Sequence, residues 1–531
     1  MTKLQETLGV FRIGSFRNLW LGSLAANTGT LIQTVAAAWL MTLLSSSQMM
    51  VALVQAAASA PLLAGGYVAG IMADNYDRRR VMLVAQLFMM ASALLLMVLY
   101  QAGAMTPWLL LALTFLLGSG TALFMPSWQA SIGDLVPQQD LAAAVSLSGM
   151  GLNLTRSLAP AIGGALIAFG GVMAGFVATA LCYPALIWAL FRWKPLPRTS
   201  KGGRETFRAS FGAGLRYVLH SPFQLRATLR ASLFGFAACV VLSLLPLVAS
   251  GRLNGGALIF GVLFACFGMG ATLAALGSAY IRALFGTEGI LRLGFSTGIA
   301  SLVIVALSPW AVLTGIAVVI TGASWLIVMS LTNVSIQLIT PRWVVGRVVA
   351  LFMSGVALGT TAGAWVWGMT AEQFGPEAAL LAAAALMCAG LVWGLVAPMP
   401  AFALTDMEPA DEISPPQTQI PIGPRSGPIT ITIEHEIAAG DVPKFLQLME
   451  RRRHLRLRGG ALDWSLHRDI EMPQLWLETY HFHDWAGYLR HRDRRVAADV
   501  QIFEEITGLH RGVVPQRIHR TCGLRHLSRT A

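Results

Sequence analysis

The chain contains a series of long apolar runs, and this feature limits its fold more than any other. Only 12% of its 531 residues are charged, and 55% are hydrophobic. A helix needs about 20 apolar residues to cross the hydrocarbon core of a bilayer. We therefore predict an all-α membrane protein with twelve transmembrane helices, near residues 17–44, 49–73, 81–101, 107–129, 145–169, 172–192, 231–250, 256–281, 289–308, 310–338, 347–371 and 377–398. The first run is too long for a cleaved signal peptide, so we expect it to remain as a span.

The loops between the predicted spans differ in charge between the two sides of the membrane. One set carries nearly all of the basic residues, including the arginines at 78–80. The opposite set carries Arg252, Glu372 and Glu377. Basic loops stay on the cytoplasmic side, so both termini are predicted to be cytoplasmic. The net charge of +12 is concentrated in these loops, which predicts contact with the lipid bilayer and no nucleic-acid partner.

The sequence repeats itself weakly with an offset of 204 residues. The matching pairs are Gly118 and Gly322, Ser131 and Ser335, Pro137 and Pro341, Gly151 and Gly355, Gly164 and Gly368, and Gly171 and Gly375. The fourth and fifth spans thus correspond to the tenth and eleventh. This predicts two parallel six-helix halves, residues 1–192 and 231–398, joined by a basic cytoplasmic loop at 193–230. Within that loop, residues 207–229 form an amphipathic pattern that predicts one helix on the inner leaflet.

The loop between the second and third spans has a distinctive spacing. It contains Gly70, then Asp74, then Arg78 and Arg79. This pattern resembles the signature loop of major facilitator superfamily transporters. The resemblance implies a cytoplasmic gate in which Asp74 meets the start of the eleventh helix near Arg347. An ordinary hairpin with basic residues on the cytoplasmic side would explain the arginines, but not Gly70 and Asp74 at this spacing.

The fifth predicted span contains a charged residue, Arg156. A charge inside the bilayer is costly unless it faces water or a partner, so we expect Arg156 to face the central cavity. The alternative is a structural arginine bonded to backbone carbonyl groups. Pro160, Gly163 and Gly164 follow in a pattern similar to the helix-five element of exporters in this superfamily. That resemblance implies tight helix packing and a hinge.

Other polar residues within the spans are candidates for lining the cavity: Asn27, Gln33, Gln55, Asn333 and Gln337. No Asp or Glu lies in the middle of a predicted span. Proton-coupled transporters usually carry a titratable group in the cavity. Proton coupling is therefore expected from the resemblance, but no residue is assigned to it.

A closer resemblance lies in the fourth and fifth spans. Residues 124–130 and 134–137, with Asn153 and Arg156, resemble the secretion-type exporters that include the enterobactin exporter. The likeness covers residues 10–398. It implies a bacterial inner-membrane exporter, not an enzyme, with a small-molecule substrate such as a siderophore. Three alternatives stay open: a multidrug efflux transporter, a bifunctional exporter whose last domain modifies the cargo, and a membrane sensor without substrate flux.

The chain changes character after the last span. Residues 399–428 are rich in proline and predict an extended linker. Residues 429–531 then predict a strand at 429–437, a helix at 441–458, strands at 461–470 and 473–483, a helix at 484–506 and a strand at 513–520. This order is ferredoxin-like and α+β. It resembles the dimeric α+β barrels of the antibiotic-biosynthesis monooxygenase type, which implies a homodimer or a regulatory role for this domain.

Nine of the ten histidines lie in this last domain. His481 and His483 share a strand face, and His435 lies on another strand, but no motif completes a set of metal ligands. The five cysteines form no C-x-x-C pair. We therefore expect no metal and no other cofactor, and we expect these histidines to belong to a polar sheet face or a dimer surface.

Overall fold

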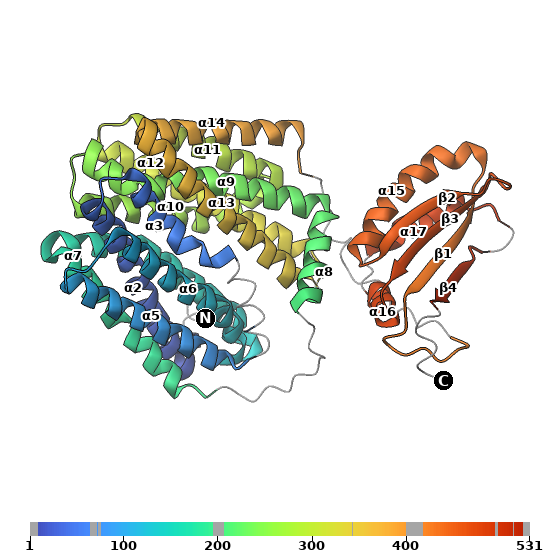
Figure 1. The fold of residues 1–531 in the computed structure, drawn as a ribbon, viewed down its shortest axis with the longest axis horizontal. Helices are drawn as coiled ribbons and strands as arrows, with labels where there is room; N and C mark the ends of the chain where they lie inside the picture. The colour runs from blue at the N-terminus through green and yellow to red at the C-terminus, as the bar shows by residue number, and fades with distance from the viewer. Residues whose placement is uncertain are drawn as a thin grey trace. The chain divides into compact units, whose positions relative to one another are not determined.

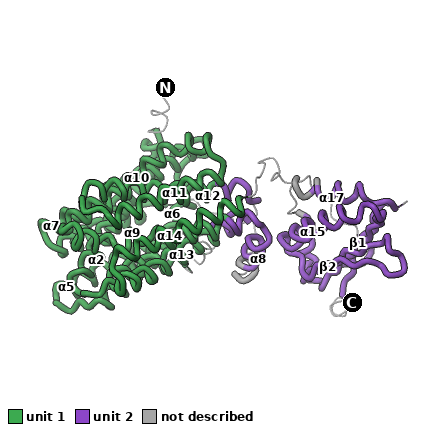
Figure 2. Tube along the Cα trace, turned by 90° about the horizontal axis from the view of Figure 1, so that it is seen from above, with its two compact units in different colours: residues 1–204, 227–334, 350–399 green, residues 205–226, 335–349, 400–531 purple. Residues whose placement is uncertain are grey.

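The computed structural model describes residues 9–63, 72, 76–194, 207–341, 344–399, 418–493, 497–512 and 515–523. The chain separates into two compact units (Figure 2). Unit 1 comprises residues 1–204, 227–334 and 350–399, and unit 2 comprises residues 205–226, 335–349 and 400–531.

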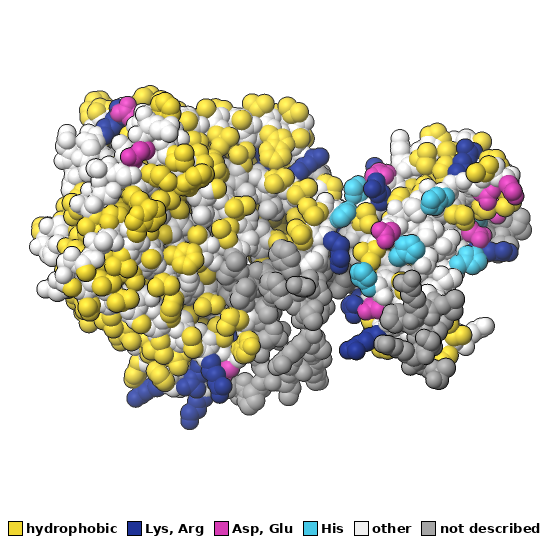
Figure 3. Space-filling model, in the orientation of Figure 1, with side chains coloured by type: hydrophobic (Ala, Val, Ile, Leu, Met, Phe, Trp, Pro, Cys, Tyr) yellow, Lys and Arg dark blue, Asp and Glu magenta, His cyan; other side chains and the backbone are white. Residues whose placement is uncertain are grey.

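Long apolar helices build the bundle (Figure 1). They are α2 (Gly14–Leu44), α3 (Gln48–Ser59), α5 (Arg78–Gln101), α6 (Pro107–Leu135), α7 (Leu141–Arg192), α9 (Pro222–Leu247), α10 (Ala257–Leu284), α11 (Thr287–Leu307), α12 (Ala311–Leu338), α13 (Val345–Phe374) and α14 (Pro376–Val396). Within the described ranges, nine helices are long and apolar enough to cross a membrane. On the face drawn in Figure 3, apolar side chains cover much of this unit. Leu181, Leu276 and Val396 are 72%, 78% and 80% exposed, as lipid-facing residues are in the absence of a bilayer.

Two glycines make sharp corners at equivalent places in the repeat. Gly171 interrupts α7 with φ +73°, and Gly375 precedes α14 with φ +88°. Both values lie in the region that side chains with a Cβ rarely adopt, so glycine is required. The break at Gly171 divides α7 between the predicted spans 145–169 and 172–192. The offset of 204 residues therefore extends to the backbone conformation.

The prediction of one amphipathic helix over 207–229 is wrong. Helix α8 spans Phe207–Leu219, and α9 begins separately at Pro222. Proline has no N–H to donate to the preceding turn, so it is favoured in the first turn of a helix and disfavoured inside one. The chain therefore starts its seventh long helix at Pro222 and not near residue 231.

Unit 2 contains a four-stranded antiparallel sheet with the order β2-β3-β1-β4 (Figure 1). Its elements are β1 (Ile429–Glu436), α15 (Val442–Arg458), β2 (Leu462–Arg468), β3 (Leu475–Phe482), α16 (Trp485–Asp493), α17 (Ala497–Leu509) and β4 (Ile518–Cys522). Strand β1 lies between β3 and β4, and Ile429 is opposite both Phe482 and Cys522. The last strand begins at residue 518, later than the predicted 513.

Alternating side chains of β1 form one wall of the core in this domain. Ile429, Ile431 and Ile433 are buried, as the two-residue period predicts. Helices α15 and α17 contact each other, and Phe445 and Ile506 from these helices pack with Trp476 of β3. The predicted helix at 484–506 is described as two helices, α16 and α17.

Candidate functional site

Two arginines fasten the start of α5 to the ends of neighbouring helices. Asp77 caps α5 by accepting a hydrogen bond from the Arg79 backbone N–H at 2.9 Å. The Arg78 Nη1 donates to the Asp134 carboxylate at 2.9 Å and to the Ala130 carbonyl at 2.5 Å. Arg79 donates to the Leu190 carbonyl at 2.8 Å. These bonds hold α5, α6 and α7 together at the end of the bundle that carries the basic loops, here called the basic end.

A second ion cluster lies at the basic end of the other half and was missed by the sequence analysis. Glu288, at the start of α11, accepts from Arg230 of α9 at 2.5 Å and from Arg292 at 2.9 Å. The Arg230 side chain is fully buried, and Glu288 also accepts from the Met399 backbone N–H at 3.0 Å. The pair Glu288 and Arg292 has the i, i+4 spacing of a helical ion pair, and that spacing was the available signal.

The two clusters follow the internal repeat. Arg79 of α5 donates to the Leu190 carbonyl, and Arg292 of α11 donates to the Gly394 carbonyl at 3.2 Å. Leu190 and Gly394 are 204 positions apart. Each half therefore uses an arginine of its third helix to bind the last turns of its sixth helix, which fits two repeated six-helix halves.

Not every residue of the predicted gate can be placed. Gly70 and Asp74 lie outside the described residues. Arg347 lies in the first turn of α13, and its backbone N–H donates to the Val344 carbonyl at 3.0 Å. Arg78 and Arg79 are held by the bonds described above. The gate role of all five residues stays a prediction.

Arg156 lies on a different face of α7 from a row of apolar exposed residues. Leu154, Leu158 and Ile162 are 51%, 53% and 47% exposed and recur at four-residue spacing. Two residues turn an α-helix by about 200°, so Arg156 points away from that row. Its side chain is exposed, and among the described residues no hydrogen bond or ion pair holds its guanidinium. Arg156 is thus separated from the apolar row, and its place in a central cavity stays a prediction.

The three predicted hinge residues, Pro160, Gly163 and Gly164, pack against other helices. Gly163 lies against Ile32 of α2, where a Cβ would come within 3.2 Å of the Ile32 Cα. Gly164 lies against Gly261 of α10, where a Cβ would come within 2.7 Å of the Gly261 Cα. Pro160 is buried, and α7 stays helical through it until Gly171. These residues serve close packing, and their action as a hinge stays a prediction.

The predicted cavity residues differ in their surroundings. Gln33 is only 4% exposed, and both polar atoms of its amide are buried without a hydrogen-bond partner in the described ranges. A buried amide without a partner is costly, so Gln33 is the best candidate among them for contact with water or a ligand. Asn27 and Gln55 are half-buried, and Asn333 is buried. Gln337 is exposed and belongs to unit 2.

The opposite end of the bundle, here called the far end, carries the three charges that the sequence analysis placed there. Arg252 follows α9 in a π-helix (Val248–Arg252) and pairs with Glu377 of α14 at 2.6 Å. It also donates to the carbonyl groups of Ala306 and Leu307 at the end of α11. A cavity of about 350 Å³ adjoins this pair and is lined in part by Gln48 of α3. Glu372 lies at the end of α13.

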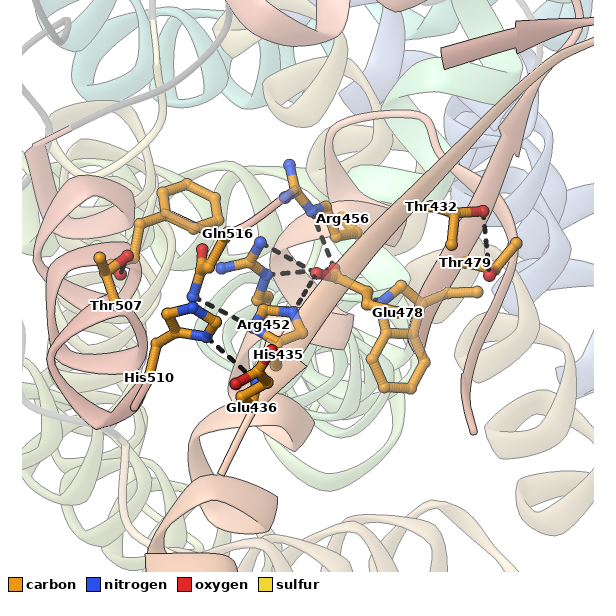
Figure 4. A network of polar contacts seen from close by, with 12 residues as sticks. Thr432, His435, Glu436, Arg452, Arg456, Glu478, Thr479, Thr507, His510 and Gln516 are labelled. Carbon is orange, nitrogen blue, oxygen red and sulfur yellow. Dashed lines mark hydrogen bonds and ion pairs between the residues drawn. The ribbon is translucent and has the colours of Figure 1, made fainter. Parts of the chain in front are cut away.

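A buried ion cluster lies in unit 2 (Figure 4). Glu478 of β3 is fully buried and accepts from Arg452 at 2.9 and 3.1 Å and from Arg456 at 3.2 Å. Its other partners are the Trp464 indole N–H at 3.1 Å and His435 at 3.4 Å. Every partner comes from α15, β1 or β2, so the carboxylate joins the helix to the sheet.

The pKa values in this cluster do not suit acid–base catalysis. Burial by itself would raise the pKa of Glu478, but the Arg452 and Arg456 guanidiniums outweigh it and hold the pKa well below its usual range. Burial lowers the pKa of His435. At neutral pH the carboxylate is therefore charged and the imidazole neutral, whereas a general acid or base needs a pKa near the working pH. The cluster fits a structural role.

The histidines named in the sequence analysis do not converge. His435 contacts Glu478, whereas the Nδ1 of His481 lies 2.9 Å from the Thr430 hydroxyl on a neighbouring strand. His483 follows β3. In the part of the chain that the structure describes, no group of three His, Cys, Asp or Glu side chains could hold a metal ion.

Comparison with known proteins relates the chain to membrane transporters. The family model described as transmembrane secretion effector matches residues 5–527. The uncharacterized MFS-type transporter YfiS of Bacillus subtilis (strain 168) is 26% identical over 342 residues, covering 62% of this chain and 79% of the relative. The enterobactin exporter EntS of Escherichia coli O81 (strain ED1a) is 27% identical over 324 residues, covering 60% of this chain and 76% of the relative.

Solved structures share the fold at low sequence identity. A bacterial homolog of the human lysosomal transporter Spinster, in an inward-facing and occupied conformation, has a TM-score of 0.59 and 15% identity, covering 73% of this chain and 96% of that chain. The nucleoside transporter NupG has a TM-score of 0.54 and 12% identity, covering 71% of this chain and 98% of that chain. These likenesses establish the transporter fold of the bundle and nothing about its substrate.

Proposed function

The chain belongs to the transmembrane secretion effector family of major facilitator transporters, and on that premise we propose that it is a secondary active exporter. Its relatives are transporters, so it is not an enzyme. The proposed mechanism is alternating access driven by protons, and the proposed cargo is a small anionic metabolite such as a siderophore. The exposed guanidinium of Arg156, turned away from the apolar row of α7, carries this proposal because it offers an anion a site inside the bundle.

The proposed architecture has twelve membrane helices in two halves, residues 1–192 and 222–398, with the second half starting at Pro222 of α9. The proposal counts α2, α3 and each of the two segments of α7 as one span, together with the other long helices. The positions of the basic loops support cytoplasmic termini and a place in a bacterial inner membrane. After the linker at 399–428, residues 429–531 are proposed to be a ferredoxin-like domain, which the order β2-β3-β1-β4 supports.

Inverted membrane vesicles test the transport proposal. Catecholates and cationic dyes are offered to vesicles with and without a proton gradient, and uptake is measured. We expect catecholate uptake that needs the gradient and falls at least tenfold in Arg156→Ala, with dye uptake unchanged. Equal loss of both substrates would make Arg156 structural, and unchanged uptake of both would remove it from the site. Gradient-driven uptake of dyes alone favours a multidrug transporter, and no uptake at all favours a sensor.

We propose that the last domain regulates the transporter through the loop between its halves. Within unit 2, α15 contacts α8, the helix of that loop. The Arg458 guanidinium lies 5.3 Å from the centre of the Tyr217 ring, and the rings of His454 and His220 are 6.4 Å apart. Deleting residues 429–531 is expected to change the rate of transport without changing the chemical identity of the cargo. A modified product that disappears on deletion would support the bifunctional alternative.

A homodimer formed through the last domain is a further proposal. Thr430, Thr432 and His481 lie on the face of the sheet opposite the buried isoleucines of β1, and all three side chains are half-buried. Light scattering of the detergent-solubilised full chain, compared with the chain lacking residues 429–531, tests the dimer. A mass of two chains that drops to one upon deletion is the expected result, and one chain in both samples contradicts it.

A further inference from the structure

The two halves of the bundle meet along two lines of contact at equivalent positions in the repeat. Along the first, here called the α7–α10 seam, the hydroxyls of Ser157 and Thr272 are 2.9 Å apart. Along the second, the α3–α13 seam, the hydroxyls of Ser59 and Thr361 are also 2.9 Å apart. Ser157 and Thr361 are separated by 204 residues. The same hydroxyl contact therefore recurs at both seams.

At each seam, a glycine two helical turns further toward the far end lets the two helices approach closely. On α7 it is Gly164, which touches Gly261, and on α13 it is Gly368, which touches Ala52. A Cβ on Gly368 would lie 2.8 Å from the Ala52 Cβ and 3.2 Å from the Met49 Cα. Gly164 and Gly368 are again 204 residues apart. Backbones that approach this closely hold the halves together by dispersion over the whole contact.

One contact breaks this symmetry. Glu372 lies one helical turn beyond Gly368, and its Oε2 accepts from the Ser47 hydroxyl at 3.0 Å and from the Met49 backbone N–H at 3.0 Å. Met49 lies in the first turn of α3, where backbone N–H groups have no partner within the helix. The residue 204 positions earlier is Ala168, whose side chain has no polar group. Among the described residues, a carboxylate from one half thus caps a helix of the other half at the α3–α13 seam and not at the α7–α10 seam.

We propose that Glu372 is the latch of the outer gate, the contact that keeps the far end shut between the two halves. The carboxylate supplies a negative charge at the positive end of α3, and it reaches that end only while the α3–α13 seam is closed. Opening the far end breaks both hydrogen bonds and leaves the first turn of α3 with an uncapped N–H. This inference rests on the proposed alternating-access function and on the proposed orientation, which places the far end outside the cell.

A neighbouring acid provides a matched control. Glu377 is also exposed at the far end, but it pairs with Arg252, so its contact stays within the second half. Removing Glu377 disturbs the same surface but leaves both hydrogen bonds between Glu372 and the first half in place. Ser47 provides the reciprocal variant, because its hydroxyl donates to Glu372 from the opposite half.

Distance measurements between spin labels test the latch. Cysteines are introduced at the exposed Ser46 and Gln373 in a chain whose five native cysteines are replaced, and distances are measured in lipid nanodiscs. Losing a helix cap and its charge is expected to raise the ratio of separated to closed outer ends about tenfold in Glu372→Ala. Glu372→Gln is expected to have a smaller effect, because it keeps a neutral acceptor. Glu377→Ala is expected to match the parent chain.

The reciprocal variant separates a latch from a merely stabilising contact. Ser47→Ala should shift the distances in the same direction, and its combination with Glu372→Ala should shift them by less than the sum of the two single effects, because the Ser47–Glu372 hydrogen bond is common to both changes. Ser47→Ala alone also removes the cap that the hydroxyl gives to the Met50 N–H, and Glu372→Ala alone removes the bond to the Met49 N–H. Distances unchanged in Glu372→Ala, or shifted equally in Glu377→Ala, would overturn the proposal. Because the labels report without substrate, a chain that carries no cargo in vesicles but shows these shifts disproves the exporter and not the latch.

Discussion

Ser157 and Thr361 make the same hydroxyl contact of 2.9 Å on opposite seams of the bundle, although 204 residues separate them. Their partners, Thr272 and Ser59, come from different positions in the repeat, so the contact is conserved in geometry more than in sequence. The hydroxyls of Ser157 and Thr361 therefore make equivalent contacts between the two halves.

Removing either of these two hydroxyl contacts should shift the opening of the outer ends by a similar amount. A hydrogen bond between neutral groups contributes about 0.5–1.5 kcal/mol, so Ser157→Ala and Thr361→Ala should each raise the open-to-closed ratio of the outer ends by roughly two- to tenfold. Spin-label distances at both seams measure that ratio. A large effect from one variant and none from the other would show that the two seams contribute unequally to the closed state of the outer ends.

The glycine contact at the α7–α10 seam should not tolerate a side chain. A Cβ at Gly164 would lie 2.7 Å from the Ala257 carbonyl oxygen, and backbone atoms cannot yield as a flexible side chain does. We expect Gly164→Ala to cost about 1–3 kcal/mol in stability, measured by thermal unfolding in detergent. Gly149→Ala on the same helix is the control, because a Cβ there meets no atom within 4 Å. Equal unfolding temperatures for the two variants would contradict the close packing.

The Glu288 cluster should be essential to the second half. Arg230→Gln takes a buried cation from Glu288, and breaking a buried ion pair typically costs about 3–5 kcal/mol. Because Glu288 keeps Arg292 as a partner, the lower end of that range is expected. Thermal unfolding of the purified chain measures the loss. Arg453→Gln, in an exposed pair with Glu450, serves as the control and should change little.

The last domain should lose stability in acid because of Glu478. Its pKa in the folded chain lies below the usual value of about 4.3, so the unfolded state takes up protons first as the pH falls. The contribution is complete above that value and disappears as the pH drops through the folded pKa. The protection of the β1 and β3 amides against hydrogen exchange in the full chain, corrected for the intrinsic pH dependence of exchange, should fall below about pH 4. In Glu478→Gln the exchange should be faster at neutral pH and should depend less on acid.

The sequence predicted the helical bundle well because lipid leaves few choices. A run of apolar residues must form a helix to satisfy its backbone inside a bilayer, so the predicted spans from residue 81 onward match the described helices closely, except that the span predicted at 231–250 begins at Pro222. The weak repeat also predicted which glycines are equivalent, and Gly171 and Gly375 share a left-handed backbone conformation. The strand at Ile429 followed from its two-residue period.

Contacts between distant segments could not be predicted in this way. The cap that Glu372 places on α3 joins residues more than 300 positions apart, and no sequence pattern near Ser47 indicates it. The burial of Arg230 depends on three helices meeting, whereas the sequence shows only a basic residue before a span. The helix expected over 207–229 failed because amphipathic periodicity continued across Pro222, where the proline required a new start.

The corner at Gly171 has a mechanical consequence. Because one left-handed residue joins the two segments of α7 directly, there is no slack between them. The first segment carries Ser157 and Gly164 at the seam. The second ends at the Leu190 and Phe191 carbonyl groups, which accept hydrogen bonds from Arg79. Helix α7 thus connects the α7–α10 seam with the basic end of the bundle through a single residue, Gly171. Gly375 makes the equivalent connection between α13 and α14 in the other half, where Arg292 donates to the Gly394 carbonyl.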